Sequence, residues 1–187
     1  MLGTAKIEVY IEDFFDSWVN KINSLTLTSA HLPNNLKALY LNQPFLSSGF
    51  KQLIIEKSEA KYFDNISSQI NNSYFHLTDI SKPLPILDAE KIYNAKKYPS
   101  PDNIIALFRR VGINNIFHQV NRSAKADLEN VLTSFNDIRT SIAHDGIPVG
   151  INDRDIIKKL RGIKNLIYHI DKTLFKHINV SIRPSTS

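Results

Sequence analysis

The 187-residue sequence contains no cysteine, and this absence excludes several classes of protein at once. Without thiolates there is no disulfide framework, no cysteine-ligated metal site and no cysteine nucleophile. Long apolar runs are also lacking, because no stretch approaches the ~18 apolar residues that a membrane-spanning helix needs. The first residues lead directly into acidic, amphipathic sequence and show no signal peptide. We therefore expect a cytoplasmic protein that does not enter a membrane.

Arginine is absent from the first half of the chain, so charge is distributed unevenly. Residues 1–95 contain eight lysines and ten acidic residues, a net charge of −2. Residues 96–187 contain fifteen basic and eight acidic residues, a net charge of +7, and the whole chain carries +5. A basic half indicates a polyanionic partner such as nucleic acid, although a solvated basic helix surface gives the same composition.

Apolar residues recur at helical spacing along most of the chain, which predicts an all-α fold. We expect helices at about residues 4–25, 33–43, 49–72, 101–111, 113–121, 123–144 and 153–178. The last two, joined by a turn-rich break, predict a hairpin, and with the first long helix they predict an antiparallel helical bundle. We assign residues 1–180 to a single domain and residues 181–187 to a disordered tail.

The stretch at about 73–100 interrupts the helical pattern. It contains Pro83, Pro85 and Pro99 together with serines and aspartates, and it predicts a long irregular connection in which a short strand or helix is possible. A connection of this length inside a compact domain is often mobile or functional. One hypothesis is that it serves as a docking arm.

Local signals mark two helix starts and one close contact. Ser100 suits the N-cap position before Pro101, the first helical residue. Asn152 and Asp155 have the spacing of a capping box at the start of the last helix. Gly162 interrupts that helix and predicts a close approach of another part of the chain.

The residues best suited to chemistry are Arg139 and His144, near the end of the helix predicted at 123–144. Arginine offers a permanent cation with planar donors for phosphate, and histidine titrates near neutral pH. Five residues on an ideal helix correspond to roughly 500°, so the two side chains point about 140° apart. They converge only if the helix frays near His144 or if a second chain completes the site. Taken alone, the spacing favours a surface arginine and a histidine that stabilises the helix C-terminus.

Residues 139–146 resemble the Arg-x4–6-His signature of HEPN domains. In that superfamily the signature ends one helix, before a turn and a final amphipathic helix, and residues 151–157 resemble this restart. Other segments are similar to one branch, the RiboL-PSP-associated HEPN domains, namely residues 8–13, 32–37, 98–104 and 107–113. The resemblance covers about residues 5–178.

The resemblance implies a HEPN-like bundle and a metal-independent endoribonuclease without cofactors, often a toxin or anti-phage defence effector. Its partners would be RNA, a second copy in a homodimer with a shared cleft, and an antitoxin or other defence protein. In the implied mechanism an RNA 2′-hydroxyl attacks its own phosphate. His144 would act as general base or acid, and Arg139 would stabilise charge on the phosphate.

Two neighbours, Thr140 and Asp145, are expected to support this pair. Asp145 either orients His144 or caps the turn. Many active members of the superfamily have Asn, Asp or His directly after the arginine, and Thr140 departs from that pattern. This departure motivates an alternative, a non-catalytic RNA- or protein-binding HEPN module of a defence system.

Further basic and titratable residues lie on the last predicted helix. Lys158, Lys159, Arg161 and Lys164 form a basic surface beside the proposed cleft, which is either a solvated helix face or a contact for the RNA backbone. His169 and His177 are eight residues apart. Because they lack convergent ligands, we interpret them as surface residues rather than as a metal site.

Overall fold

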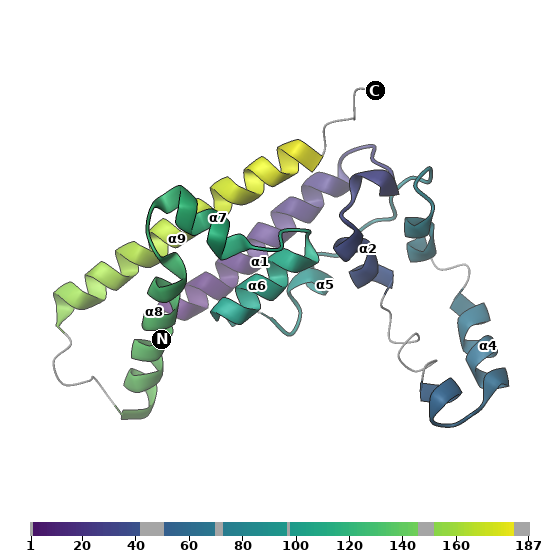
Figure 1. Cartoon of the computed structure of the whole chain (residues 1–187), viewed down its shortest axis with the longest axis horizontal. Helices are drawn as coiled ribbons and strands as arrows, with labels where there is room; N and C mark the ends of the chain where they lie inside the picture. The colour runs from purple at the N-terminus through teal and green to yellow at the C-terminus, as the bar shows by residue number, and fades with distance from the viewer. Residues whose placement is uncertain (1, 42–50, 70–72, 97, 146–151, 182–187) are drawn as a thin grey trace. The chain divides into compact units, whose positions relative to one another are not determined.

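A computed structural model describes residues 2–41, 51–69, 73–96, 98–145 and 152–181 (Figure 1). The described residues are predominantly helical and contain no strand, only an isolated antiparallel bridge between Thr28 and Pro83. The all-α prediction is therefore confirmed. In the same residues, no helix has the length and apolar character required to cross a membrane.

Helices of very different length follow one another along the chain, with η marking a 3-10 helix. They are α1 (Leu2–Asn23), η1 (Ser29–His31), α2 (Asn34–Leu41), α4 (Glu59–Gln69), η2 (Ser73–Thr78), α5 (Glu90–Tyr93), α6 (Pro101–Arg110), α7 (Ile116–Ala124), α8 (Leu128–Asp145) and α9 (Asp153–Ser181). The irregular connection predicted at about 73–100 thus contains the short helices η2 and α5.

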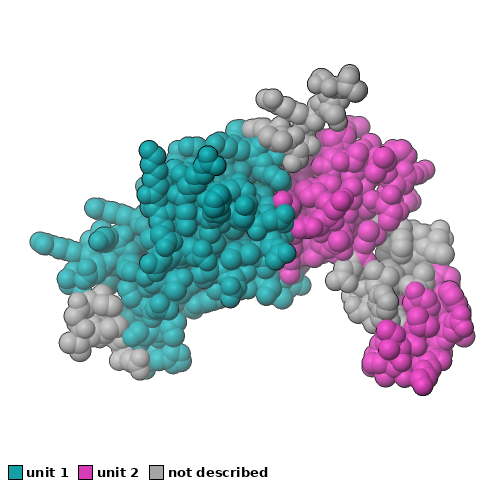
Figure 2. Space-filling view, in the orientation of Figure 1, with its two compact units in different colours: residues 1–14, 93–109, 113–187 teal, residues 15–92, 110–112 magenta. Residues whose placement is uncertain are grey.

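The chain divides into two compact units (Figure 2). Unit 1 contains residues 1–14, 93–109 and 113–187, and unit 2 contains residues 15–92 and 110–112. The single domain expected over residues 1–180 remains a prediction. Of the predicted tail, only Ser181 belongs to the described residues, as the last residue of α9.

Unit 1 is built around α7, α8 and α9, which pack against one another. A Cβ atom added at Gly162 of α9 would lie 2.7 Å from Cγ1 of Val131 in α8. The close approach predicted at this glycine is confirmed. Buried apolar side chains of unit 1 come from most of its helices and include Ile7, Ile11, Leu107, Phe117, Val120, Leu132, Leu166 and Leu174.

Unit 2 holds a long irregular stretch in place with polar contacts. The Asn23 side chain donates to the carbonyl of Leu87 and accepts from its N–H, both at 2.9 Å. The hydroxyl of Tyr40, a fully buried residue, donates to the carbonyl of Asp88 at 2.6 Å. The backbone N–H of Leu84 donates to Leu27. Side chains and backbone therefore replace the hydrogen bonds that a regular helix would supply.

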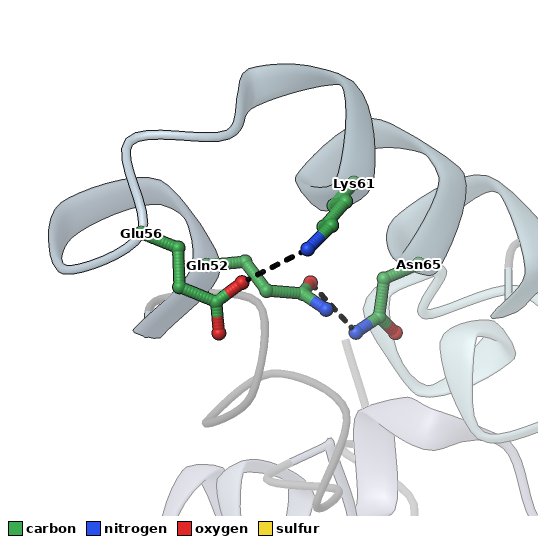
Figure 3. A network of polar contacts seen from close by, with 4 residues as sticks. All are labelled: Gln52, Glu56, Lys61 and Asn65. Carbon is green, nitrogen blue, oxygen red and sulfur yellow. Dashed lines mark hydrogen bonds and ion pairs between the residues drawn. The ribbon is translucent and has the colours of Figure 1, made fainter.

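The single helix predicted over 49–72 is wrong, because the described part of this range is a helical hairpin. Residues 51–54 are helical, Lys57 adopts a left-handed conformation with φ of 52°, and α4 starts at Glu59. Two contacts close the hairpin, Lys61 with Glu56 at 3.4 Å and Asn65 with Gln52 at 3.2 Å (Figure 3). In the sequence, apolar residues keep helical spacing across this turn, so their spacing alone does not predict the turn.

The boundary between α7 and α8 also differs from the prediction. We expected a helix start at residue 123, but α7 continues to Ala124 and Lys125 is left-handed with φ of 52°. The α8 helix starts at Leu128, where the Asp127 carboxylate accepts the N–H of Asn130 at 3.1 Å. This aspartate is the N-cap that the sequence interpretation overlooked.

Both predicted caps are confirmed. The Ser100 hydroxyl accepts the N–H of Asn103 at 3.2 Å at the start of α6. At α9, the Asn152 side chain accepts the N–H of Asp155 at 3.1 Å, and the Asp155 carboxylate accepts the N–H of Asn152 at 3.3 Å. This reciprocal pair is a capping box, and it fixes the start of the longest helix.

Candidate functional site at the end of α8

The predicted catalytic pair lies near the end of α8, and this helix continues without a break past both residues. Arg139 is half-buried and His144 is exposed. Because the helix remains regular to Asp145, the two side chains leave its axis about 140° apart. Fraying of α8 therefore does not bring Arg139 and His144 of one chain together.

Arg139 is held against an aromatic ring. The centre of its guanidinium group lies 5.1 Å from the centroid of the Tyr98 ring, within the range of a cation–π interaction. Tyr98 precedes α6 and belongs to the same unit as α8. The contact restricts the long arginine side chain while leaving its charge in place for an anion.

The segment that carries Tyr98 is itself fixed by hydrogen bonds. The Asn136 side chain of α8 donates to the carbonyl of Pro99 at 2.9 Å, and the Asn103 side chain donates to the carbonyl of Tyr98 at 2.9 Å. The N–H of Ser100 donates to the same Tyr98 carbonyl at 2.9 Å. Tyr98 is therefore positioned from both α6 and α8.

Asn136 lies three residues before Arg139 and is buried. Its Oδ1 atom receives no hydrogen bond from the residues that the structure describes. Asn136 thus places a buried side-chain amide one helical turn before Arg139, and the N–H of this amide holds the Pro99 carbonyl.

The structure describes only one of the two expected supporting residues in full. Thr140 is exposed on α8. Asp145 is the last residue of α8, and its side chain lies outside the described residues. The roles predicted for both remain predictions.

Apolar side chains at this end of the hairpin are not covered. Ile142 of α8 and Leu160 of α9 are 38% and 45% exposed. Ile157 of α9 is 48% exposed. The ribbons of the last turns of α8 and the first turns of α9 lie apart (Figure 1).

The predicted RNA-binding residues lie on the first half of α9. Lys158, Arg161 and Lys164 are exposed, whereas Lys159 is half-buried. All four lie within four residues of Gly162, which contacts Val131. Val131 precedes His144 by 13 residues, or roughly 20 Å of rise along α8. The basic surface is therefore level with the first half of α8 and separate from His144.

One histidine was misplaced by the sequence interpretation. We expected His169 at the surface, but it is buried, and its Nδ1 atom shares a hydrogen bond with the Ser123 hydroxyl of α7 at 2.9 Å. His177 is half-buried. In the part of the chain that the structure describes, no three histidine or acidic side chains gather as metal ligands would.

Sequence reasoning missed the roles of Tyr98 and Asn136. Asn136 follows Leu132 by four residues on the buried stripe of α8, and a polar residue on such a stripe indicates a buried hydrogen bond. That signal was present in the sequence. For Tyr98 no local pattern pointed to Arg139, because the contact joins residues 41 positions apart in sequence.

An all-α fold with an arginine and a histidine at the end of its penultimate helix is the arrangement that HEPN domains share. The family model described as RiboL-PSP-HEPN matches residues 2–176, and the chain belongs to this family. Comparison with curated proteins and with solved structures gives no match. The predicted family and branch are therefore confirmed.

Proposed function

We propose that the protein is a metal-independent endoribonuclease of the HEPN type that acts as a homodimer. The observation that carries the proposal is the end of α8, where Arg139 is held against Tyr98 and His144 is exposed. Membership of the RiboL-PSP-HEPN family supports it. The first residue supplies fixed positive charge, and the second supplies acid–base chemistry near neutral pH.

The proposed reaction is a transesterification within RNA. His144 accepts the proton of a 2′-hydroxyl, whose oxygen then forms a bond to the adjacent phosphorus. The bond from phosphorus to the 5′-oxygen breaks, and that oxygen takes a proton from an imidazolium. The products are a 2′,3′-cyclic phosphate and a free 5′-hydroxyl. Arg139 stabilises the negative charge that accumulates on the phosphoryl oxygens.

A second copy supplies what one chain lacks. Arg139 and His144 of one chain point about 140° apart on α8, so a phosphate held by one is not near the other. A two-fold dimer places the ends of two α8 helices together. The exposed Ile142 of α8 and Leu160 of α9 provide apolar surface for that contact.

The basic residues of α9 are proposed to bind the RNA backbone. Lys158, Arg161 and Lys164 are exposed and carry charge that phosphate contacts require. Lys159 is half-buried and adds to the positive electrostatic potential of this surface. The physiological part of the proposal is a cytoplasmic toxin or anti-phage effector that an antitoxin or defence partner controls.

The decisive experiment is a cleavage assay on total RNA in the presence of EDTA. The wild-type protein should cleave, and His144→Ala and Arg139→Ala should not, with unchanged circular dichroism. Mapping of the fragment ends should find 2′,3′-cyclic phosphates. Cleavage by purified His144→Ala at the wild-type rate would refute the proposal. Growth arrest on expression of the wild type but not of His144→Ala tests the toxin role.

Mixing the two inactive variants tests the shared site. If arginine and histidine come from different chains, random pairing of Arg139→Ala with His144→Ala regenerates one intact site in each mixed dimer, or about a quarter of the sites. Cleavage should therefore return after the variants are mixed and allowed to exchange subunits. A mixture that exchanges subunits and stays inactive would contradict a site of this kind.

One observation favours the alternative, a non-catalytic RNA- or protein-binding HEPN module. Within one chain, the regular α8 helix directs the side chains of Arg139 and His144 away from each other. The residue directly after Arg139 is the exposed Thr140. This module would bind RNA equally well as wild type and as His144→Ala, and neither would cleave it. Binding measured beside cleavage separates the two functions.

A further inference from the structure

The most solvent-facing line of α9 carries large apolar side chains. Ile157, Tyr168 and Phe175 are 48%, 59% and 68% exposed. Relative to Ile157, Tyr168 follows by 11 residues and Phe175 by 18, which on a helix correspond to offsets of about 20° and 0°. The three side chains therefore lie along one line. The opposite face of α9 contains the buried Leu166, Ile170 and Leu174.

Basic side chains alternate with these rings. Arg161, Lys164 and Lys172 are exposed and lie within about 60° of the same line. Tyr168 and Phe175 are separated by seven residues, or about 10 Å along the axis, with Lys172 between them. The apolar surface is thus divided by cations. A protein interface or a bilayer favours a continuous apolar patch, whereas alternating rings and cations match the bases and phosphates of a nucleic acid strand.

The ring of the next residue along α9 restricts the Tyr168 ring. Tyr168 packs edge-to-face against the His169 ring, with centroids 5.1 Å apart and an interplanar angle of 86°. His169 is buried and held by the Ser123 hydroxyl at 2.9 Å. An exposed ring that is already oriented loses less conformational entropy when it binds a base.

Asp171, an acidic residue close to the same line, accepts a hydrogen bond from another helix. The hydroxyl of Tyr10 in α1 donates a short hydrogen bond to the Asp171 carboxylate. Burial, followed by this bond and the charge of Asp171, raises the pKa of Tyr10 above its usual value. The tyrosine therefore keeps its proton at neutral pH. Part of the carboxylate charge is satisfied within unit 1, which reduces its repulsion of a polyanion.

We propose that the solvent-facing line of α9, from Ile157 to Phe175, is a track for single-stranded RNA. Bases stack on Tyr168 and Phe175, and phosphates pair with Arg161, Lys164 and Lys172. The inference rests on the proposed function for the identity of the polyanion. The line is roughly 27 Å long, the length of about eight nucleotides stacked at 3.4 Å each. A duplex hides its base faces and gains nothing from the two rings.

The test measures RNA binding separately from cleavage. Full-length His144→Ala serves as the parent, so that labelled RNA stays intact during fluorescence anisotropy. In that background Tyr168→Leu and Phe175→Leu keep apolar surface but remove the aromatic face. Each should weaken binding of a ten-nucleotide single strand by about tenfold. Tyr168→Phe should retain the affinity of the parent.

Phe63→Leu is the matched control, because Phe63 is an aromatic ring that is 56% exposed on α4 and does not belong to the proposed track. It should bind as the parent does. An RNA strand of the same length with abasic positions should bind the parent more weakly than the intact strand does. The parent and Phe175→Leu should bind this abasic strand with equal affinity. Lys164→Gln should lower the slope of log affinity against log salt by about one, whereas the ring variants leave that slope unchanged.

The outcomes distinguish the track from the proposed function. Equal affinity of the ring variants and the parent overturns the track, whatever cleavage shows. Ring variants that shift the monomer–dimer equilibrium without changing RNA affinity assign this face to a second copy and also overturn it. Ring-dependent binding by a wild-type protein that cleaves no RNA supports the track and rejects the endoribonuclease.

Discussion

Two regions of the molecule, the irregular residues 79–89 of unit 2 and the α8–α9 end of unit 1, differ in how their backbone is held and in how their apolar side chains are covered. In unit 2, residues 79–89 are irregular, yet the Asn23 side chain and the Tyr40 hydroxyl hold their backbone at 2.6–2.9 Å. In unit 1, the end of α8 and the start of α9 are regular helix, yet Ile142, Ile157 and Leu160 remain exposed. At the end of α8 and the start of α9, regular backbone thus carries uncovered apolar side chains. In residues 79–89, where Ile80 and Ile86 are exposed as well, specific hydrogen bonds hold the irregular backbone in place.

The difference indicates where each region obtains its stability. The irregular stretch depends on a few specific hydrogen bonds, each of which leaves a buried group without a partner when it is removed. The α8–α9 end satisfies its own backbone, and its exposed apolar side chains are available for the proposed dimer contact. We therefore expect substitutions in unit 2 to change stability, and those at the end of α8 to change activity.

The largest expected effect is the loss of cleavage in His144→Ala. Removal of an acid–base catalyst typically lowers the rate by about 10²–10⁴, equivalent to ~3–5 kcal/mol of activation free energy. Because His144 is exposed, the thermal unfolding midpoint of the His144→Ala variant should match that of the wild type. Calorimetry beside the EDTA cleavage assay checks both statements. A large drop in midpoint would show that this end of α8 is structural.

The next effect is the loss of stability in Tyr40→Phe. This change removes the hydroxyl of a buried tyrosine that donates to the Asp88 carbonyl in a partly buried hydrogen bond. Unfolding free energy should fall by about 0.5–1.5 kcal/mol, measured by urea denaturation. Ile142→Gln, at an exposed site of the proposed dimer contact, is the comparison and should change it by less than about 0.5 kcal/mol in protein dilute enough to be monomeric. Equal effects of the two variants would remove the contrast between the regions.

Gly162→Ala tests the contact on which the α8–α9 hairpin is built. The new methyl group would lie 2.7 Å from Val131 Cγ1, a stiff side chain that cannot move aside. Overpacking of about 1–3 kcal/mol exceeds the ~1 kcal/mol gained in helix propensity, so stability should fall. Val131→Ala in the same chain should restore it. Failure of this second change to restore stability would place the strain elsewhere.

Tyr98→Leu should lower cleavage several-fold without loss of fold. The cation–π contact contributes ~0.5–2 kcal/mol to the position of Arg139, equivalent to about 2- to 30-fold in rate. Because Tyr98 acts through Arg139, Tyr98→Phe should retain the wild-type rate, and Tyr98→Leu should have no effect in Arg139→Ala when binding is the readout. An additive loss of RNA affinity in that double variant would show that Tyr98 binds RNA independently.

The sequence predicts the parts of this molecule that depend on local signals. The all-α periodicity, the Ser100 cap and the Asn152–Asp155 box are confirmed, because each depends on residues a few positions apart. The close approach at Gly162 is also confirmed, because the missing side chain is itself a local signal, although Val131 lies 31 positions away. The turn at Lys57 and the break at Lys125 were missed, because neither left-handed residue is a glycine.

The sequence predicted the two residues of the candidate site but not the contacts that position them. Arg139 and His144 followed from the signature, whereas the Tyr98 contact joins two elements distant in sequence. The burial of His169 depends on the position of α7 across from α9, which periodicity does not give. Tertiary contacts of this kind determine which residues of an amphipathic helix become functional.

The smallest expected effect concerns Tyr10 and Asp171, the contact between α1 and α9. Burial and Asp171 raise the pKa of Tyr10 above the value of about 10 that it has in the unfolded chain. The protonated form is therefore favoured by folding, so its contribution is complete below pH ~10 and is lost as the pH rises further. Tyr10→Phe should cost about 0.5–1 kcal/mol at pH 7 and should reduce the loss of stability between pH 10 and 11. Urea denaturation at both pH values checks this, and an unchanged alkaline slope in the variant would mean that another group causes it.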